Sequence, residues 1–116
     1  MAGSAYVLAM SGSLSELEHL VLLAVLRLGE GAYGVSIQQE LAETARRKTT
    51  RAAVYVALRR LETKGHLVGR LAEPTAERGG RAKRFYLLEE RGLEALREQQ
   101  ASLSRMWAGV EERLGS

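Results

Sequence analysis

The stretch TTRAAVYVALRRLETKG, residues 49–65, decides the fold. Thr49 or Thr50 offers a side-chain oxygen that can cap a helix N-terminus, and Lys64-Gly65 is typical of a helix end. Apolar residues recur between them at the three- and four-residue spacing of one helical face: Val54, Ala57, Leu58 and Leu61. The opposite face is small, aromatic and basic: Ala52, Tyr55, Val56, Arg59, Arg60 and Thr63. These residues predict an amphipathic helix with a basic outer face.

The spacing of the apolar residues changes after this helix. Residues 67–73 (LVGRLAE) and 83–88 (KRFYLL) both have the pattern of strands. Between them, residues 74–82 contain Gly79-Gly80 flanked by Arg78 and Arg81. The sequence therefore predicts a β-hairpin with a basic tip.

Two more helices are expected before residue 49. The first begins in the overlapping capping boxes Ser13-x-x-Glu16 and Ser15-x-x-Glu18 and ends at Gly29. It is apolar nearly all round, which predicts burial on more than one side. The second runs from about Tyr33 to Ala45. Its expected inner face is Gly34, Ile37, Leu41 and Ala45, and its expected solvent face is Gln38, Gln39, Glu40 and Glu43.

Three helices followed by a two-stranded ribbon form the order of a winged helix-turn-helix. We therefore predict a mainly α fold with a small β hairpin. Residues 14–88 would form the winged helix-turn-helix domain, residues 1–13 an N-terminal extension, and residues 89–116 a C-terminal dimerisation helix. At 116 residues the chain is long enough for one such domain.

The positive charge is concentrated in one part of the chain. Residues 46–84 hold twelve Lys and Arg against three Glu, a net +9, whereas the remainder is −6. A segment polarised in this way indicates a polyanionic partner. The alternative is a solvated basic surface, which the accompanying helix and hairpin pattern disfavours.

The last segment predicts a long helix from Glu89 or Glu90 to Leu114. Its apolar residues alternate in steps of three and four, with one polar interruption, as in a coiled coil: Leu93, Leu96, Gln100, Leu103, Trp107, Val110 and Leu114. We expect this stripe to meet a second copy of the chain, together with Leu17 and Val21 of the first helix. The alternative is that the stripe packs only on its own domain.

Several functions are disfavoured by composition. The chain has no Cys, Asp or Asn and only two His, so no cofactor, metal site or catalytic centre is expected. His19 lies in an apolar helix and His66 follows a helix end, so structural roles are expected for both. No secretory signal and no membrane-length apolar run is present, which predicts a cytoplasmic protein.

The sequence resembles the PadR-like family of winged helix-turn-helix transcription regulators over about residues 14–114. The resemblance lies in Leu17 to Gly29, Ala32-Tyr33-Gly34-Val35-x-Ile37, Ala53-Val54-Tyr55-x-x-Leu58-x-x-Leu61-Glu62-x-x-Gly65, Glu77-Arg78-Gly79-Gly80-Arg81-x-x-Arg84-x-Tyr86-x-Leu88 and Gly92-x-x-Ala95-Leu96. It implies a homodimeric repressor that dimerises through its last helix and responds to a small lipophilic or phenolic effector. Glu89-Glu90-Arg91-Gly92 departs from the family's usual start of that helix.

The fold places the helix of residues 49–65 in a DNA major groove and the hairpin against phosphates or the adjacent minor groove. The candidate DNA-binding residues are Lys48, Thr49, Thr50, Arg51, Tyr55, Arg59, Arg60, Arg78, Arg81, Lys83 and Arg84. With no Asn or Gln on the helix, direct reading falls to an arginine on guanine, either Arg59 or Arg51. Tyr55 donates to a phosphate or packs as a half-buried aromatic.

Trp107, Tyr6 and Met10 are the candidate effector-binding residues; the alternative for Trp107 is an ordinary core or interface residue. Two other classes of function compete with operator binding. One is a winged helix used only for protein interaction, and the other is an RNA-binding or nucleic-acid-modifying enzyme.

Overall fold

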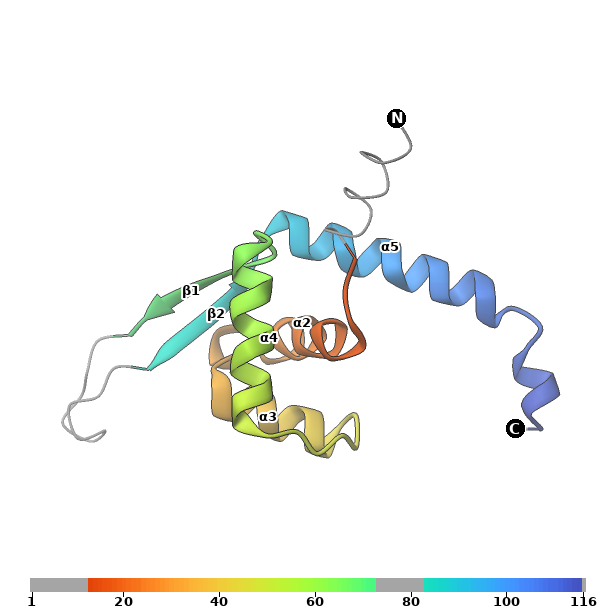
Figure 1. The fold of residues 1–116 in the computed structure, drawn as a ribbon, viewed down its shortest axis with the longest axis horizontal. Helices are drawn as coiled ribbons and strands as arrows, with labels where there is room; N and C mark the ends of the chain where they lie inside the picture. The colour runs from red at the N-terminus through yellow and green to blue at the C-terminus, as the bar shows by residue number, and fades with distance from the viewer. Residues whose placement is uncertain (1–12, 73–82, 116) are drawn as a thin grey trace.

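The structure is a computed structural model that describes residues 13–72 and 83–115. Its elements, in chain order, are α2 (Glu16–Leu28), the 3-10 turn η1 (Gly29–Gly31), α3 (Gly34–Glu43), α4 (Arg51–Thr63), β1 (Leu67–Leu71), β2 (Arg84–Leu88), α5 (Glu90–Trp107) and the 3-10 turn η3 (Glu111–Leu114). Helices α2, α3 and α4 form one packed unit, from which the hairpin and α5 project on opposite sides (Figure 1). The predicted winged helix-turn-helix order is confirmed.

Helix α2 begins at the second of the two predicted capping boxes. The Ser15 hydroxyl accepts the Glu18 amide at 3.1 Å, and the Ser15 amide donates to Glu18 Oε1 at 3.0 Å. The helix ends at Gly29, whose φ of 59° is left-handed and therefore favours glycine. Its buried positions spread around the helix, because α3, α4 and α5 all pack on it.

Helix α4 has the boundaries and the face that its sequence predicts. Thr50, rather than Thr49, caps it by accepting the Ala53 amide at 3.0 Å. Its buried residues are Val54, Ala57, Leu58 and Leu61. These side chains join Val21, Leu22 and Ile37 in one hydrophobic core.

The hairpin is antiparallel, with Leu67 opposite Leu88 and Leu71 opposite Arg84. Of its described residues, Leu67 and Tyr86 are buried in the core and Leu88 packs against it. The Tyr86 amide donates to the Ala32 carbonyl at 2.9 Å, which fixes β2 against the turn between α2 and α3. From this attachment β1 and β2 extend away from the three helices (Figure 1).

Helix α5 changes its surroundings along its length. Gly92, Ala95 and Leu96 are buried against the domain, and Gln99 binds both the amide and the carbonyl of Leu14 at 3.2 Å. Every described residue from 100 onward is exposed. The first two residues of the predicted stripe, Leu93 and Leu96, therefore lie against their own domain, whereas the stripe from Gln100 onward is exposed.

The prediction of one helix continuing to Leu114 is wrong. Helix α5 ends at Trp107; Ala108 leaves the helical region with ψ 121°, and Gly109 has a φ of 78°. Val110 then leads into the separate turn η3, so Val110 and Leu114 do not continue the seam of α5.

No helix among the described residues is long and apolar enough to cross a membrane.

Candidate nucleic-acid interface

Helices α3 and α4 form the helix-turn-helix, and the basic linker between them is held in place from two sides. The Arg47 amide donates to the Leu41 carbonyl at 2.9 Å. The Arg47 guanidinium pairs with Glu16, with Nη1 2.6 Å from Oε1 and Nη2 3.2 Å from Oε2. Arg47 thus connects the linker to α2, and its charge is already matched by a carboxylate.

The outer face of α4 carries the cations expected to meet DNA. Arg51, Tyr55 and Arg59 recur every four residues and are all exposed, so they lie along one stripe of the helix. Ala52, Val56 and Arg60 are exposed beside them, and Lys48 and Thr50 are exposed at the N-terminal end. This face has the length and chemistry that a recognition helix presents to a major groove.

Thr49 is half-buried rather than fully presented to a ligand. Its hydroxyl is one of two buried side-chain polar atoms, among the described residues, for which no hydrogen-bond partner is found. Its carbonyl accepts Gln38 Nε2 of α3 at 2.8 Å. The Oε1 atom of the same Gln38 accepts Arg51 Nε at 3.4 Å.

The expectation that Gln38 faces solvent is therefore wrong. Its side chain is half-buried and bridges α3 to the start of α4. The spacing of α3 already separates Gln38 from its exposed neighbour Gln39, because Gln38 lies four residues after Gly34 and three before Leu41, beside the inner face. The partners of its amide come from the next helix and the segment before it.

Tyr55 packs over the first residue of α3. A methyl group built on Gly34 would overlap the Tyr55 hydroxyl and lie 2.8 Å from Tyr55 Cε1. The ring still keeps 40% of its surface exposed. The ring is therefore partly buried against α3 although Tyr55 lies on the outer stripe of α4, and its donation to a phosphate stays a prediction.

Two cations at the outer end of the described strands, Lys83 just before β2 and Arg84 at its start, have partners within the chain. Lys83 Nζ lies 4.0 Å from the centre of the Tyr33 ring, which also meets Phe85 edge to face. Arg84 Nη2 lies 2.7 Å from Glu62 Oε2 of α4, and this contact raises the pKa of Arg84. Arg78 and Arg81 lie outside the described residues.

Lys64, at the end of α4, is likewise paired. Its Nζ lies 2.9 Å from Glu18 Oε1, a carboxylate that is only 5% exposed. Burial by itself would raise the pKa of Glu18, but the Lys64 ammonium and the Ser15 amide outweigh it and lower that pKa. Part of the basic segment therefore stabilises the fold, whereas the stripe on α4 points outward.

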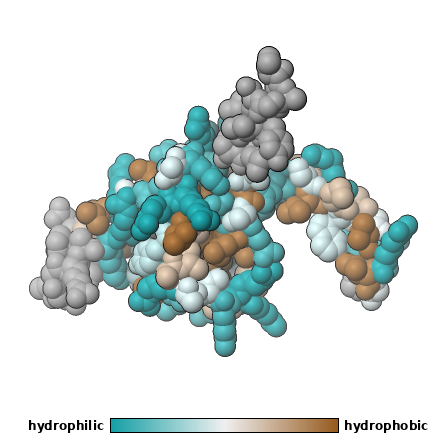
Figure 2. Space-filling model, viewed as in Figure 1, coloured by the Kyte–Doolittle hydropathy of each residue, from teal (hydrophilic) through white to brown (hydrophobic). Residues whose placement is uncertain are grey.

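The residues expected to dimerise fall into three groups. Val21 and Leu96 belong to the core of the single chain, with 0% and 6% exposure, so they offer no surface to a partner. Leu17 and Leu93 are half-buried at its edge, and Gln100 is exposed. The large exposed apolar side chains at the C-terminal end are Leu103, Met106, Trp107, Val110 and Leu114. Figure 2 shows apolar side chains gathered over this end of the molecule.

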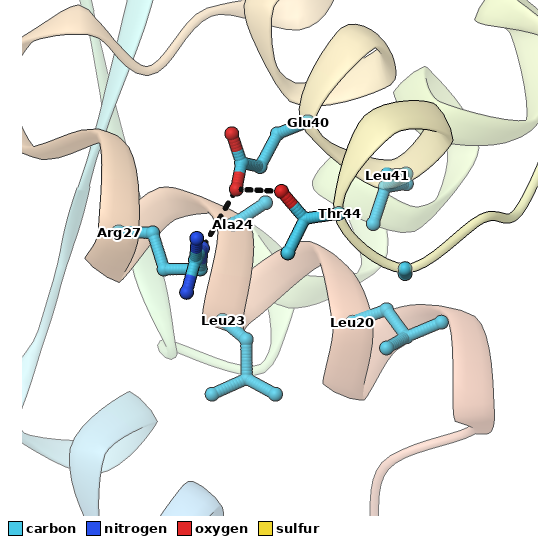
Figure 3. A pocket seen from close by; sticks show the side chains of 8 residues that line it. Leu20, Leu23, Ala24, Arg27, Glu40, Leu41 and Thr44 are labelled. Carbon is cyan, nitrogen blue, oxygen red and sulfur yellow. Dashed lines mark hydrogen bonds and ion pairs between the residues drawn. The ribbon is translucent and has the colours of Figure 1, made fainter.

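Helix α2 is flanked by two apolar grooves that share Leu20 and Leu23. One, of about 280 Å³, lies between α2 and α3 (Figure 3), where Arg27 and Thr44 both bind Glu40 Oε2 at the rim, at 2.6 and 2.7 Å. The other, of about 320 Å³, lies between α2 and α5 and also contacts Gln99 and Leu103. The grooves and the end of α5 are thus apolar surfaces of the described chain.

The effector residues are not brought together by the described structure. Trp107 is 46% exposed near the end of α5 and lines neither groove. Tyr6 and Met10 lie outside the described residues. Within the described ranges no three His or Glu side chains are arranged to hold a metal ion.

Three packed helices, a hairpin wing and a basic outer face on the second helix of the helix-turn-helix define a winged-helix DNA-binding protein. Residues 22–98 match the model of the family described as "Transcriptional regulator PadR-like family". The chain belongs to this family of transcription regulators, as its sequence motifs indicated. Regulation of transcription through DNA, and not catalysis, is the activity of the family.

Solved structures give the same result. A PadR family transcription regulator from Clostridium difficile is 22% identical with a TM-score of 0.69, covering 86% of this chain and 99% of its own. A PadR-like transcription factor from Bacteroides fragilis is 28% identical with a TM-score of 0.69, covering 94% and 97%. A PadR family regulator from Eggerthella lenta is 26% identical with a TM-score of 0.67, covering 97% and 92%. Among curated proteins no significant match is found.

Proposed function

We propose that the chain is a sequence-specific repressor that acts in the cytoplasm as a homodimer on a pseudo-palindromic operator. The observation that carries the proposal is the exposed stripe of Arg51, Tyr55 and Arg59 on α4. In a homodimer, the two α4 helices are related by a twofold axis. They would read half-sites about 34 Å apart.

The residues of the interface have different roles in this proposal. Arg51 or Arg59 reads guanine, because a guanidinium can donate two hydrogen bonds to O6 and N7. Lys48, Thr50 and Arg60 contact phosphates beside the stripe, and Arg78 and Arg81 do so from the hairpin tip. Thr49 and Lys83 already have structural surroundings, so we assign them to positioning the interface. Arg84 is held by Glu62 of α4, and we propose that this ion pair keeps it away from phosphate.

The proposed dimer joins residues 89–116 of two copies. The exposed apolar end of α5 supports it, because a large apolar surface on a small domain is typical of an interaction site. We propose that Leu103, Met106 and Trp107 meet the partner, with Leu17 and Leu93 at the edge of the contact. A planar aromatic or lipophilic effector would then bind beside Trp107 and alter the spacing of the two domains.

DNA binding is tested by selection from a random duplex library, followed by titration of the enriched duplex against bulk nonspecific DNA and RNA. If each protomer neutralises about three to four phosphates, the slope of log K against log salt is about −5 to −7 for the dimer. Equal binding to RNA, or failure to enrich any motif, would refute operator recognition. Absence of any DNA affinity would favour a protein-interaction module.

The dimer is tested by sedimentation of Leu103→Glu, which places a charge on the exposed apolar surface. The matched control is Ala101→Glu, an exposed position two residues earlier and therefore on another side of the helix. We expect Leu103→Glu alone to sediment as a monomer.

Because Trp107 is the sole tryptophan, its fluorescence reports effector binding directly. An unchanged spectrum with a panel of planar aromatics would contradict the effector proposal.

A further inference from the structure

We infer that Gln38 of α3 is a positioning residue that sets the base preference of Arg51, an inference that rests on the proposed operator binding. Gln38 is outside the recognition helix and is not itself assigned to DNA. Its amide nevertheless contacts both the main chain that leads into α4 and the first side chain of α4.

The orientation of the Gln38 amide is fixed by its two neighbours. Its Nε2 donates to the Thr49 carbonyl at 2.8 Å, which only the nitrogen end of the amide can do. Its Oε1 then faces Arg51 and accepts from Arg51 Nε at 3.4 Å. A reversed amide would place donor against donor at Arg51 and acceptor against acceptor at Thr49. The two contacts therefore enforce one another.

This arrangement uses one donor of Arg51 and leaves the rest for a base. A guanidinium has five N–H donors in a rigid plane, and Nε supplies only one of them. With Nε held by Gln38, the two terminal nitrogens remain able to donate to O6 and N7 of a guanine. An exposed arginine without such a support samples many rotamers, and binding must then order it. Gln38 thus restricts Arg51 to fewer geometries before DNA arrives.

A purely structural role for Gln38 makes a different prediction. In that case the contact that matters is the one to the Thr49 carbonyl, which holds the linker, and any change that removes the amide donor has the same effect. If Gln38 acts through Arg51, the oxygen acceptor matters instead. Glutamate keeps the acceptor and loses the donor, whereas methionine has a similar length and loses both.

The experiment uses the full-length protein, a random duplex library and four variants: Gln38→Met, Gln38→Glu, Arg51→Ala and the control Gln39→Met. Gln39 is exposed on the same helix. Each base pair of the duplex selected by the natural chain is changed in turn. The base pair at which the natural chain discriminates and Arg51→Ala does not is the one assigned to Arg51. Binding of each variant to the matched and changed duplexes is then measured, together with its thermal unfolding.

We expect Gln38→Met to reduce the preference at that base pair about tenfold, within the roughly 5- to 150-fold range of one bidentate contact. Gln38→Glu should retain the preference within about twofold while binding all duplexes more weakly, because its charge opposes phosphate. Gln39→Met should match the natural chain. Adding Gln38→Met to Arg51→Ala should cause no further loss of preference.

Other outcomes overturn the inference. Equal loss of preference in Gln38→Met and Gln38→Glu would assign Gln38 to holding the linker, and unchanged preference in both would remove its role. If Arg51→Ala alters no base preference, Arg51 does not read sequence and the inference fails while operator binding stands. If the natural chain selects no motif, the proposed function itself fails.

Discussion

Arg84 Nη2 lies 2.7 Å from Glu62 Oε2, and this ion pair joins the second strand of the hairpin to the recognition helix. The guanidinium lies across β1, where a methyl group on Gly69 would be 2.6 Å from Arg84 Nε. The two side chains are 43% and 27% exposed, so solvent screens the pair and its contribution to stability is small. In the proposed interface, this pair withholds one cation from DNA.

Replacement of Glu62 by Gln should release Arg84 toward phosphate. We expect a loss of less than about 1 kcal/mol in the free energy of unfolding, as for other partly exposed pairs. Nonspecific DNA affinity should rise, and the log–log salt slope of the dimer should steepen by about two, one contact for each protomer. A weaker affinity with an unchanged slope would show instead that Arg84 must stay on Glu62 for the hairpin to bind.

A second prediction concerns the contact between Gly34 and Tyr55. Gly34→Ala should displace the Tyr55 ring, reduce the free energy of unfolding by about 1 kcal/mol and weaken DNA binding. In a Tyr55→Ala background the same substitution should cause no loss, because the obstruction is gone. Gly31→Ala is the control, since a methyl group there meets nothing within 4 Å. Equal losses in both backgrounds, measured by denaturant unfolding, would argue against the contact.

Gly92 allows α5 to approach the end of α4. A methyl group there would overlap the His66 carbonyl oxygen and lie 2.6 Å from Leu88 Cδ2. The His66 carbonyl is main chain and already accepts the Glu89 amide at 3.0 Å, so it is not free to move away. Gly92→Ala should therefore reduce the free energy of unfolding by about 1–3 kcal/mol. An unfolding midpoint equal to that of the natural chain would contradict this close contact.

Stability should fall in mild acid because of His66. Burial, and then the charges of Lys64 and Arg91, lower the pKa of this histidine below its ordinary 6.5, although Glu18 opposes the shift. Its side chain is 5% exposed and its Nδ1 has no partner among the described residues. As the pH falls below about 6.5, the unfolded chain takes up the proton before the folded chain does, and stability decreases.

The measurement is thermal unfolding between pH 7 and pH 5. His66→Gln should flatten this part of the profile, leaving a residual slope from His19, whose pKa is also lowered by burial. Glu16→Gln is the control for the pH range, because the pKa of Glu16 is lowered from 4.5 by Arg47 and its contribution is lost only in stronger acid. An unaltered slope in His66→Gln would refute the assignment.

Much of the domain could be predicted because its signals are local. The capping box at Ser15, the cap at Thr50 and the inner face of α4 depend on residues within one or two helical turns of one another. The outer stripe of α4 follows from the same periodicity. The α4 residues that the sequence predicts to face outward are therefore exposed in the structure.

The wrong expectations come from partners distant in sequence, from the polarity of one side chain or from backbone torsions. The sequence does not predict that Glu62 and Glu18 neutralise Arg84 and Lys64, because the paired residues are 22 and 46 positions apart. Gln38 is polar, which favours solvent, although its spacing from Gly34 and Leu41 places it beside the inner face. The sequence beyond Trp107 keeps the helical periodicity, and the ψ of 121° at Ala108 and the φ of 78° at Gly109 interrupt the helix. Val21 fits the seam pattern, yet in this small domain it fills the core.

The exposed end of α5, residues 100–107, restricts which insertions and deletions the chain can tolerate in evolution. Helix α5 holds the domain through Ala95 and Leu96 and presents its apolar end from Leu103 onward. One inserted residue between these points would turn the apolar end by about 100° and advance it by about 1.5 Å. In a dimer joined there, that change would reorient both recognition helices on the operator. Substitutions in this exposed end of α5 should therefore be tolerated far more readily than insertions or deletions.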